Sequence, residues 1–122
     1  SKMINNQPIT MSSGIQLFDV IDVTDCANTY LAVMENGKRL KSYMAGSGKP
    51  QMLKKYILEM QTLFPDYSDL SIDTKKYADV VLNEELFDTS NVVKDTNFVP
   101  KIDFKESLIC LTEYIKKYSI KY

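Results

Sequence analysis

GIQLFDVIDVTDCANTYLAVMENGKRLKSYMAGSGKP, residues 14–50, is the stretch that decides the fold of this 122-residue chain. It predicts, in order, a strand, a capped helix, a second short strand and a Gly-Ser-Gly turn. Residues 17–23 are rich in β-forming side chains between polar neighbours, which is typical of a strand. Thr24 is the expected N-cap of the helix and Asp25 its first-turn acid, because both complement the free amides of a helix start. The Asn-Gly pair at 36–37 is the expected stop.

The segments on either side complete an α+β pattern. Residues 42–45 predict a short strand, and Pro50, which suits a first helical turn, opens an amphipathic helix that ends near Phe64. The remaining expected elements are an edge strand over residues 8–11, a strand near 80–82, a short helix over 88–94 and a terminal helix opened by the capping box of Asp103 and Glu106. We therefore expect one α+β domain, residues 1–122, derived from an α/β fold, with about four helices and short strands.

The charge of the chain is balanced. Its 15 basic and 16 acidic residues give a formal net charge of −1, whereas a surface for nucleic acid or anionic membrane needs a net basic face. We therefore expect no nucleic-acid partner and no membrane partner. No apolar run is long enough to span a bilayer, and the first residues, SKMINNQP, lack the apolar core of a signal peptide. The expected location is the cytoplasm.

The chain lacks histidine, and its two cysteines are Cys26 and Cys110. Histidine is the commonest general base and transition-metal ligand, so its absence excludes Ser-His-Asp and Cys-His catalysis within this chain and disfavours a zinc site. Both cysteines fall on the apolar side of an expected helix. We expect two small core side chains in a reducing compartment rather than a disulfide.

Gly46-Ser47-Gly48 has two interpretations. Between a strand and a helix, two glycines let the backbone approach a phosphate at a helix N-terminus. The full G-x-G-x-x-G fingerprint is not met, because Gln51 takes the last glycine position and Pro50 removes an amide donor. A lone G-x-G is weak evidence for a nucleotide site, so a tight turn is the favoured interpretation.

Three aspartates, Asp19, Asp22 and Asp25, follow one another at intervals of three residues. A shared metal site would require the junction between strand and helix to curl, since side chains alternate on a pleated strand. The favoured alternative is that Asp25 supports the helix start, while Asp19 and Asp22 make local bonds or face solvent.

Five motifs carry a family resemblance: Gly14–Asp19 (GIQLFD), Val23–Asp25 (VTD), Ser42–Gly48 (SYMAGSG), Asp88–Ser90 (DTS) and Asn97–Glu106 (NFVPKIDFKE). In this order they resemble the C-terminal part of the nucleotide-sugar epimerases, dehydratases and reductases of the extended short-chain dehydrogenase/reductase family. The resemblance covers nearly the whole chain and implies a small substrate-binding subdomain of a Rossmann-type enzyme. The aromatic-Asp pair Phe18-Asp19 is most similar to the branch that acts on deoxyhexoses attached to CDP.

The resemblance implies which residues bind the nucleotide-sugar: Gln16, Phe18, Lys76 and Asp79. In much of the family an arginine binds the diphosphate at the position of Phe18. An aromatic residue there loses that contact and packs either on the nucleotide base or on the core. Lys76 and Asp79 align with a family Arg-x-Gly-Asp element that contacts phosphate and ribose, with lysine acting as a point charge.

The resemblance also implies a parent enzyme with an N-terminal Rossmann domain, outside this chain, that binds NAD or NADP. The catalytic unit of that family is Tyr-x-x-x-Lys, in which a lysine one helical turn after the tyrosine assists proton transfer with a sugar hydroxyl. None of the eight tyrosines of this chain has a lysine four positions later. We therefore expect the chain alone to bind nucleotide-sugar, but neither to bind a cofactor nor to turn over a substrate.

The alternative is a non-catalytic interaction or structural module derived from the same fold. The absence of the diphosphate-binding arginine at Phe18 and the absence of histidine suit it. Met44 and Met52, which replace a usual Asn or Cys and a usual helix cap, indicate a divergent member of the family. Asn97 replaces a family glycine, but asparagine tolerates a left-handed backbone, so a helix stop is still expected there. Bare strand edges and apolar helix faces further predict self-association, and hence a homo-oligomer.

Overall fold

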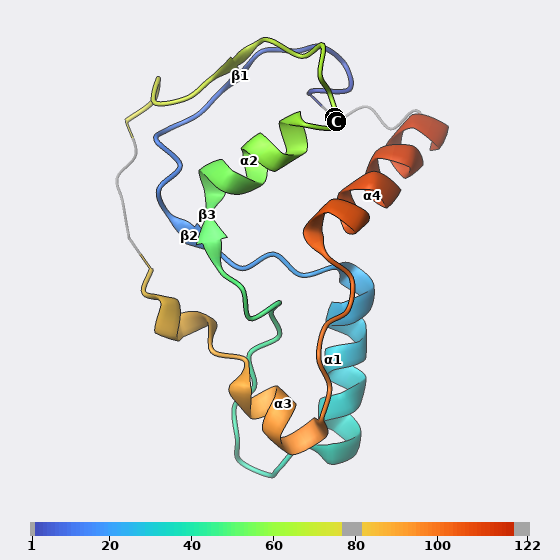
Figure 1. Cartoon of the computed structure of the whole chain (residues 1–122). Coiled ribbons are helices and arrows are strands. Elements are labelled where there is room, and N and C mark those ends of the chain that lie inside the picture. Colours follow the sequence, from blue (N-terminus) through green and yellow to red (C-terminus); the bar gives the residue numbers. More distant parts are fainter. Residues whose placement is uncertain (1, 77–81, 119–122) are drawn as a thin grey trace. The chain divides into compact units, whose positions relative to one another are not determined.

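The computed structural model describes residues 2–76 and 82–118 (Figure 1). Four α-helices and short strands confirm the α+β class predicted from the sequence. The predicted strand near 80–82 falls mostly outside the described residues. The elements are β1 (Ile9–Thr10), β2 (Leu17–Phe18), α1 (Val23–Asn36), β3 (Gln51–Met52), α2 (Leu53–Gln61), β4 (Leu70–Ser71), the 3-10 helix η1 (Glu84–Phe87), α3 (Ser90–Thr96) and α4 (Phe104–Tyr118).

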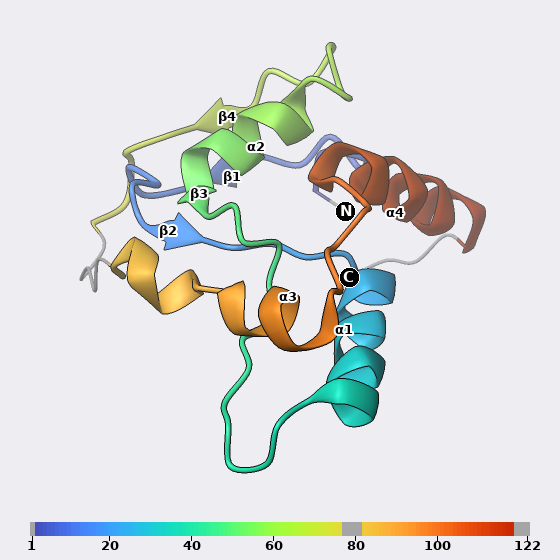
Figure 2. The ribbon, with the colours of Figure 1, turned by 60° about the horizontal axis from the view of Figure 1, so that its bottom comes forward.

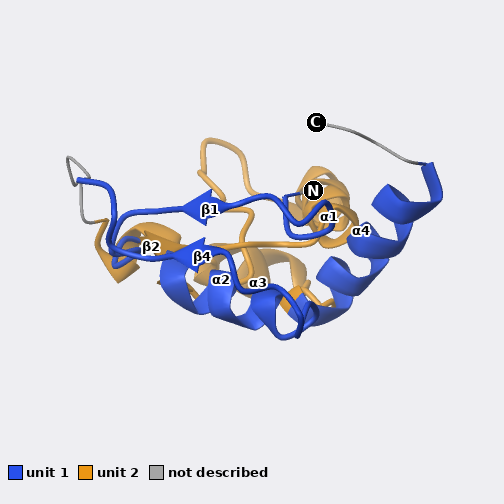
Figure 3. Cartoon of the chain, turned by 90° about the horizontal axis from the view of Figure 1, so that it is seen from above, with its two compact units in different colours: residues 1–16, 52–81, 105–122 blue, residues 17–51, 82–104 orange. Residues whose placement is uncertain are grey.

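The chain divides into two compact units, which Figure 3 colours separately. Unit 1 comprises residues 1–16, 52–81 and 105–122, and unit 2 comprises residues 17–51 and 82–104. Each unit is therefore assembled from segments that lie far apart in the sequence.

Unit 1 contains a two-stranded parallel sheet. β1 pairs with β4, with Ile9 opposite Leu70 and Thr10 opposite Ser71 (Figure 2). The buried Tyr67 supports this sheet, since its hydroxyl lies 2.6 Å from the carbonyl oxygen of Gln7 and 2.9 Å from that of Asp69. The edge strand predicted over residues 8–11 is thus confirmed as β1, while its partner β4 was not predicted.

The start of α2 lies against the chain that leads out of β1. The amide of Leu53 donates to the carbonyl of Gln16 and the amide of Lys54 to that of Gly14, both at 2.9 Å. Gly14 has a φ of +66°, and a Cβ there would come within 3.0 Å of the Lys54 backbone nitrogen. A glycine is therefore required at this position, for its backbone angle and for the close approach.

Unit 2 is built on α1 packed against α3, which lie side by side in Figures 1 and 2. Val92 on α3 is buried. The buried side chains of α1 are the polar Asp25 and Thr29, and the Thr29 hydroxyl donates to the Asp25 carbonyl at 2.8 Å. β2 pairs with β3, whose first residue, Gln51, is the last residue of the 17–51 segment of unit 2.

Several predicted boundaries in unit 2 were wrong. The strand predicted over residues 17–23 ends at Phe18, and the N-cap of α1 is Asp22 rather than Thr24: the Asp22 carboxylate accepts a hydrogen bond from the Thr24 amide at 2.7 Å. No strand forms over residues 42–45, where Tyr43 instead bonds through its side chain. Pro50 precedes β3 and does not open α2, which begins at Leu53.

The helix stops were predicted more accurately. α1 ends at Asn36, and the Gly37 amide donates to the Val33 carbonyl at 2.8 Å. α3 ends at Thr96, and its C-cap Asn97 has a φ of 57°, the left-handed conformation expected of it.

The expectation for the two cysteines holds only in part. Both are free, and Cys26 on α1 is half-buried. Cys110 is exposed, so its assignment to the core was wrong: the side of α4 that carries it faces solvent.

Candidate functional site

Gln16 is the most deeply buried of the residues predicted to bind the nucleotide-sugar. It is 6% exposed, and its backbone carbonyl accepts the Leu53 amide at the start of α2. Its side-chain oxygen Oε1 is buried and has no hydrogen-bond partner among the described residues. Because an unpaired buried acceptor costs about 1–3 kcal/mol, such a group in a folded protein calls for an explanation, and a ligand donor would supply one.

The other predicted site residues are divided between the two units or lie outside the described residues. Phe18 is the last residue of β2 in unit 2 and is 43% exposed, whereas Gln16 and the exposed Lys76 belong to unit 1. Asp79 lies outside the described residues. The nucleotide-sugar site therefore remains a prediction from the sequence.

Within unit 2, Asp19 holds the Gly-Ser-Gly turn. One of its carboxylate oxygens, Oδ1, accepts hydrogen bonds from the Ser47 amide at 3.1 Å and from the Ser47 hydroxyl. The other, Oδ2, accepts the Gly48 amide at 2.9 Å. Three donors from the turn thus converge on one carboxylate, and we call Asp19, Ser47 and Gly48 the Asp19 clamp. Gly48 itself has a φ of +70°, which favours glycine.

The clamp decides between the two interpretations of the Gly-Ser-Gly motif. A phosphate cradle needs free backbone amides that point at the anion, but the amides of Ser47 and Gly48 are already bonded to Asp19. The negative charge of Asp19 at the same amides would also repel a phosphate. The tight turn is therefore confirmed, and these residues do not fit the phosphates of a dinucleotide.

The three aspartates that could have formed a metal site have separate partners. Asp22 caps α1, Asp19 holds the turn, and the Asp25 carboxylate accepts the amides of Lys101 and Ile102, each at 2.7 Å. Across residues 2–76 and 82–118, no group of three or more His, Cys, Asp or Glu side chains is arranged to hold a metal ion. The local bond expected of Asp22 is confirmed, and Asp25 lies in the first turn of α1 as expected. The long-range contacts that the carboxylates of Asp25 and Asp19 make were not predicted.

A second buried carboxylate, Asp95 on α3, joins α3 to the loop that follows α1. Its oxygen Oδ2 is 2.6 Å from the Lys41 ammonium and accepts the Tyr43 hydroxyl at 2.8 Å, and Oδ1 forms an ion pair with Lys38 at 2.9 Å. The Lys38 amide donates to the Tyr43 hydroxyl oxygen at 2.7 Å, which closes the network. Sequence reasoning missed this cluster, since nothing links two segments that are 54 residues apart.

Lowering the pH is expected to weaken unit 2 through Asp95. Hydrogen bonds from Lys41, Lys38 and Tyr43 hold the pKa of the Asp95 carboxyl well below its usual range. The folded state therefore binds fewer protons than the unfolded state, so the stabilisation is complete above the unfolded pKa and is lost as the pH falls through the folded one. We expect Asp95→Asn to lower the urea midpoint at pH 7 and to flatten its decline between pH 5 and 3.

The matched control for this prediction is Asp66→Asn, which removes an exposed acid of unit 1. The urea midpoint of Asp66→Asn is expected to decline between pH 5 and 3 as steeply as that of the wild type. An Asp95→Asn variant whose midpoint declines as steeply as that of the wild type would contradict the role given to Asp95.

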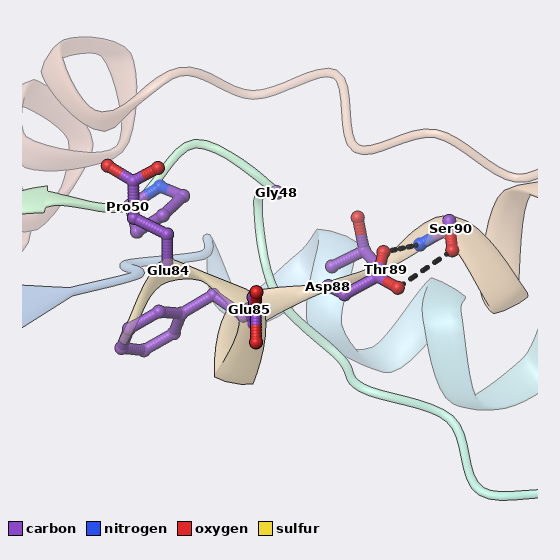
Figure 4. A pocket seen from close by; sticks show the side chains of 8 residues that line it. Gly48, Pro50, Glu84, Glu85, Asp88, Thr89 and Ser90 are labelled. Carbon is purple, nitrogen blue, oxygen red and sulfur yellow. Dashed lines mark hydrogen bonds between the residues drawn. The ribbon is translucent and has the colours of Figure 1, made fainter. Parts of the chain in front are cut away.

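Unit 2 also contains an open pocket of about 560 Å³ (Figure 4). Asp88 at its edge accepts the amide and hydroxyl of Ser90, at 2.8 and 3.0 Å, and these bonds lower the pKa of its carboxyl. The carboxylates of this pocket would repel a phosphate, whereas they offer acceptors to hydroxyl groups. The lining residues are Gly48, Pro50, Glu84, Glu85, Phe87, Asp88, Thr89 and Ser90.

Comparison with known proteins gives the family context. No model of a known protein family matches the chain. CDP-abequose synthase of Salmonella typhimurium is 29% identical over 110 residues, covering 82% of this chain and 35% of that enzyme. UDP-glucose 4-epimerase of Thermotoga maritima, solved with UDP-glucose, superposes with a TM-score of 0.82 at 18% identity, over 98% of this chain and 38% of the epimerase. The chain resembles part of the nucleotide-sugar epimerase/dehydratase family in sequence and fold.

Further solved structures of the epimerase/dehydratase family show the same fold. dTDP-glucose 4,6-dehydratase of Bacillus anthracis, in complex with NAD, has a TM-score of 0.75 at 16% identity, over 95% of this chain and 37% of the dehydratase. The resemblance predicted from the sequence is thus confirmed, and the chain spans about a third of the length of these relatives. None of the helices among the described residues is long and apolar enough to cross a membrane.

Proposed function

We propose that this chain is the C-terminal, nucleotide-sugar-binding part of an NAD- or NADP-dependent epimerase, dehydratase or reductase. The observation that carries the proposal is the match in sequence and fold to one part of such enzymes over most of the chain. In this proposal the parent enzyme oxidises or reduces a sugar carbon through nicotinamide held by the remaining part. This chain would contribute substrate contacts through Gln16, Phe18, Lys76 and Asp79.

We further propose that the substrate is a sugar attached to CDP. Sequence similarity supports the choice: the Phe18-Asp19 pair resembles the CDP-deoxyhexose branch, and CDP-abequose synthase is 29% identical over 110 residues. The buried Oε1 of Gln16 is available to a donor, and cytosine presents one in its exocyclic amine. Solved relatives contain UDP-sugars, and titration with CDP-, UDP- and dTDP-sugars therefore compares the bases directly.

The chain alone is proposed to be inactive. It has no Tyr-x-x-x-Lys pair, and its Gly-Ser-Gly turn does not fit a dinucleotide phosphate. The coding sequence upstream of Ser1 is expected to contain both a G-x-x-G-x-x-G motif and Tyr-x-x-x-Lys. An upstream reading frame that lacks both would overturn the enzymatic part of the proposal.

Calorimetric titration tests the binding function directly. The chain is titrated with CDP-glucose, UDP-glucose and dTDP-glucose, and saturable heat is expected, strongest for the CDP-sugar. CDP without sugar is the matched ligand control, because it separates recognition of the nucleotide from recognition of the hexose. Absence of heat with all three sugars would favour the alternative, a non-catalytic interaction module.

The isolated chain is also proposed to self-associate. α1 presents an apolar row to solvent, which we call the α1 stripe: Val23, Tyr30, Leu31 and Met34, with Val23 80% and Met34 81% exposed. In a longer enzyme such a face would be covered, and in isolation it favours association. We expect a dimer or larger species by light scattering at about 100 µM, a concentration at which micromolar contacts are populated.

Met34→Glu places a charge at the C-terminal end of the α1 stripe and is expected to shift the chain towards monomer. Asn28→Glu adds the same charge at an exposed position of α1 away from the stripe and should leave the association unchanged. A wild-type chain that stays monomeric at this concentration, or two variants that behave alike, would contradict the proposed interface.

A further inference from the structure

We infer that Asp19 is a positioning residue: its carboxylate holds the Gly-Ser-Gly turn on the end of β2 and thereby fixes the orientation of Phe18. The role of Phe18 in binding nucleotide-sugar rests on the proposed function. The geometry of the Asp19 clamp does not, so the two can be tested separately.

The pairing of β2 with β3 alone restrains the end of β2 weakly, and the Asp19 clamp adds further restraint there. β2 has only two residues, Leu17 and Phe18, so its ladder provides few hydrogen bonds. Asp19 follows directly, and its two oxygens accept three donors from a turn 28 residues away. Hydrogen bonds to a charged group are stronger than neutral ones, so the clamp restrains the end of the short ladder that it extends.

The two glycines of the turn make room for the clamp. A Cβ on Gly46 would collide with the Asp19 carboxylate, and a Cβ on Gly48 would lie 2.6 Å from the hydroxyl oxygen of Thr89. The turn thus passes between Asp19 and Thr89, which occupies the N-cap position of α3. Three segments of unit 2 therefore meet at one point, and the space between Asp19 and Thr89 accommodates glycine but no larger residue.

Phe18 lies next to this fixed point. Its side chain is 43% exposed, so burial alone does not set its direction. Because Asp19 is held from both oxygens, the peptide that joins it to Phe18 cannot rotate freely. Releasing the carboxylate should therefore change the surroundings of the Phe18 ring, even if the rest of unit 2 keeps its fold.

Nuclear magnetic resonance of the wild type, Asp19→Asn and Asp22→Asn tests this positioning without any ligand. Both variants remove one negative charge, but asparagine is as good an N-cap as aspartate, so Asp22→Asn keeps its structural role. In Asp19→Asn the amide nitrogen faces a donor. We expect the Ser47 and Gly48 amides to exchange with solvent about tenfold faster, and the Phe18 ring resonances to shift. Unchanged exchange and unchanged Phe18 resonances would overturn the inference.

A second variant keeps the inference testable if Asp19→Asn fails to fold. Ser47→Ala removes the hydroxyl, which donates to Asp19 and accepts the Lys49 amide at 3.2 Å, and leaves both amides of the clamp in place. It is expected to shift the Phe18 resonances in the same direction as Asp19→Asn, by a smaller amount. A Ser47→Ala variant without any shift at Phe18 would count against the clamp.

The link to ligand binding is tested with a double-mutant cycle in CDP-glucose titrations. If Asp19 acts through Phe18, Asp19→Asn weakens binding in the wild type and has no effect in a Phe18→Ala background. Equal effects in both backgrounds would show a merely structural role and overturn the inference. If the wild type binds no nucleotide-sugar, the proposed function fails, while the resonance experiment still decides whether Asp19 positions Phe18.

Discussion

Replacing Asp25 by alanine is expected to lower the free energy of unfolding by about 3 kcal/mol. The Asp25 side chain is 3% exposed, and its oxygen Oδ2 accepts the amides of Lys101 and Ile102, each at 2.7 Å. These bonds tie the first turn of α1 to the segment that follows α3, within unit 2. Alanine removes the acceptor from both amides and leaves two partly buried donors without a partner. Urea denaturation followed by circular dichroism measures the loss.

Asp25→Asn is the matched control for this prediction. Both amides bond to the same oxygen, so the single carbonyl oxygen of asparagine can receive them, and only the charge is lost. We expect a loss of about 1 kcal/mol, which is the usual net value of a neutral hydrogen bond. Amide exchange at Lys101 and Ile102 should accelerate strongly in Asp25→Ala and weakly in Asp25→Asn. Alanine and asparagine variants of equal stability would contradict this account of Asp25.

Asp25 also illustrates what the sequence could predict and what it could not. Its place in the first turn of a helix follows from local rules, as does the left-handed stop at Asn97, because caps and turns depend on residues a few positions apart. Its bond to Lys101 crosses 76 residues, and those of Asp19 and Asp95 cross 28 and 54. One sequence without relatives carries no signal for such pairs.

The short strands were also difficult to predict from the sequence. β4 was not predicted, because a two-residue strand has too few side chains to display an alternating pattern. The 3-10 helix η1 was not predicted either. Residues 42–45 have strand-forming composition, but the bond from Tyr43 to Asp95 takes them out of any ladder. The order of motifs was still sufficient for the family, since order and spacing survive when individual elements shift by a few residues.

Replacing Phe18 by arginine is expected to tighten the binding of CDP-glucose about tenfold or more. The prediction rests on the proposed function, in which Phe18 stands where much of the family has an arginine on the diphosphate. Phe18 is 43% exposed at the end of β2, so a guanidinium group at this position can reach solvent without burying its charge. A bidentate arginine–phosphate pair adds a charge-assisted contact that the wild type lacks, and its gain should diminish with added salt.

Phe18→Lys and Phe18→Leu serve as controls for the arginine variant. Lysine supplies charge without the planar fork and should give a smaller gain, while leucine keeps an apolar side chain without an aromatic face. The sign of the arginine effect also decides what Phe18 does in the natural chain. A gain with arginine and a loss of less than tenfold with leucine places the diphosphate at this position. A loss of tenfold or more with both arginine and leucine contradicts that placement and shows that the Phe18 ring stacks on the base, because base–aromatic stacking contributes about 1–3 kcal/mol.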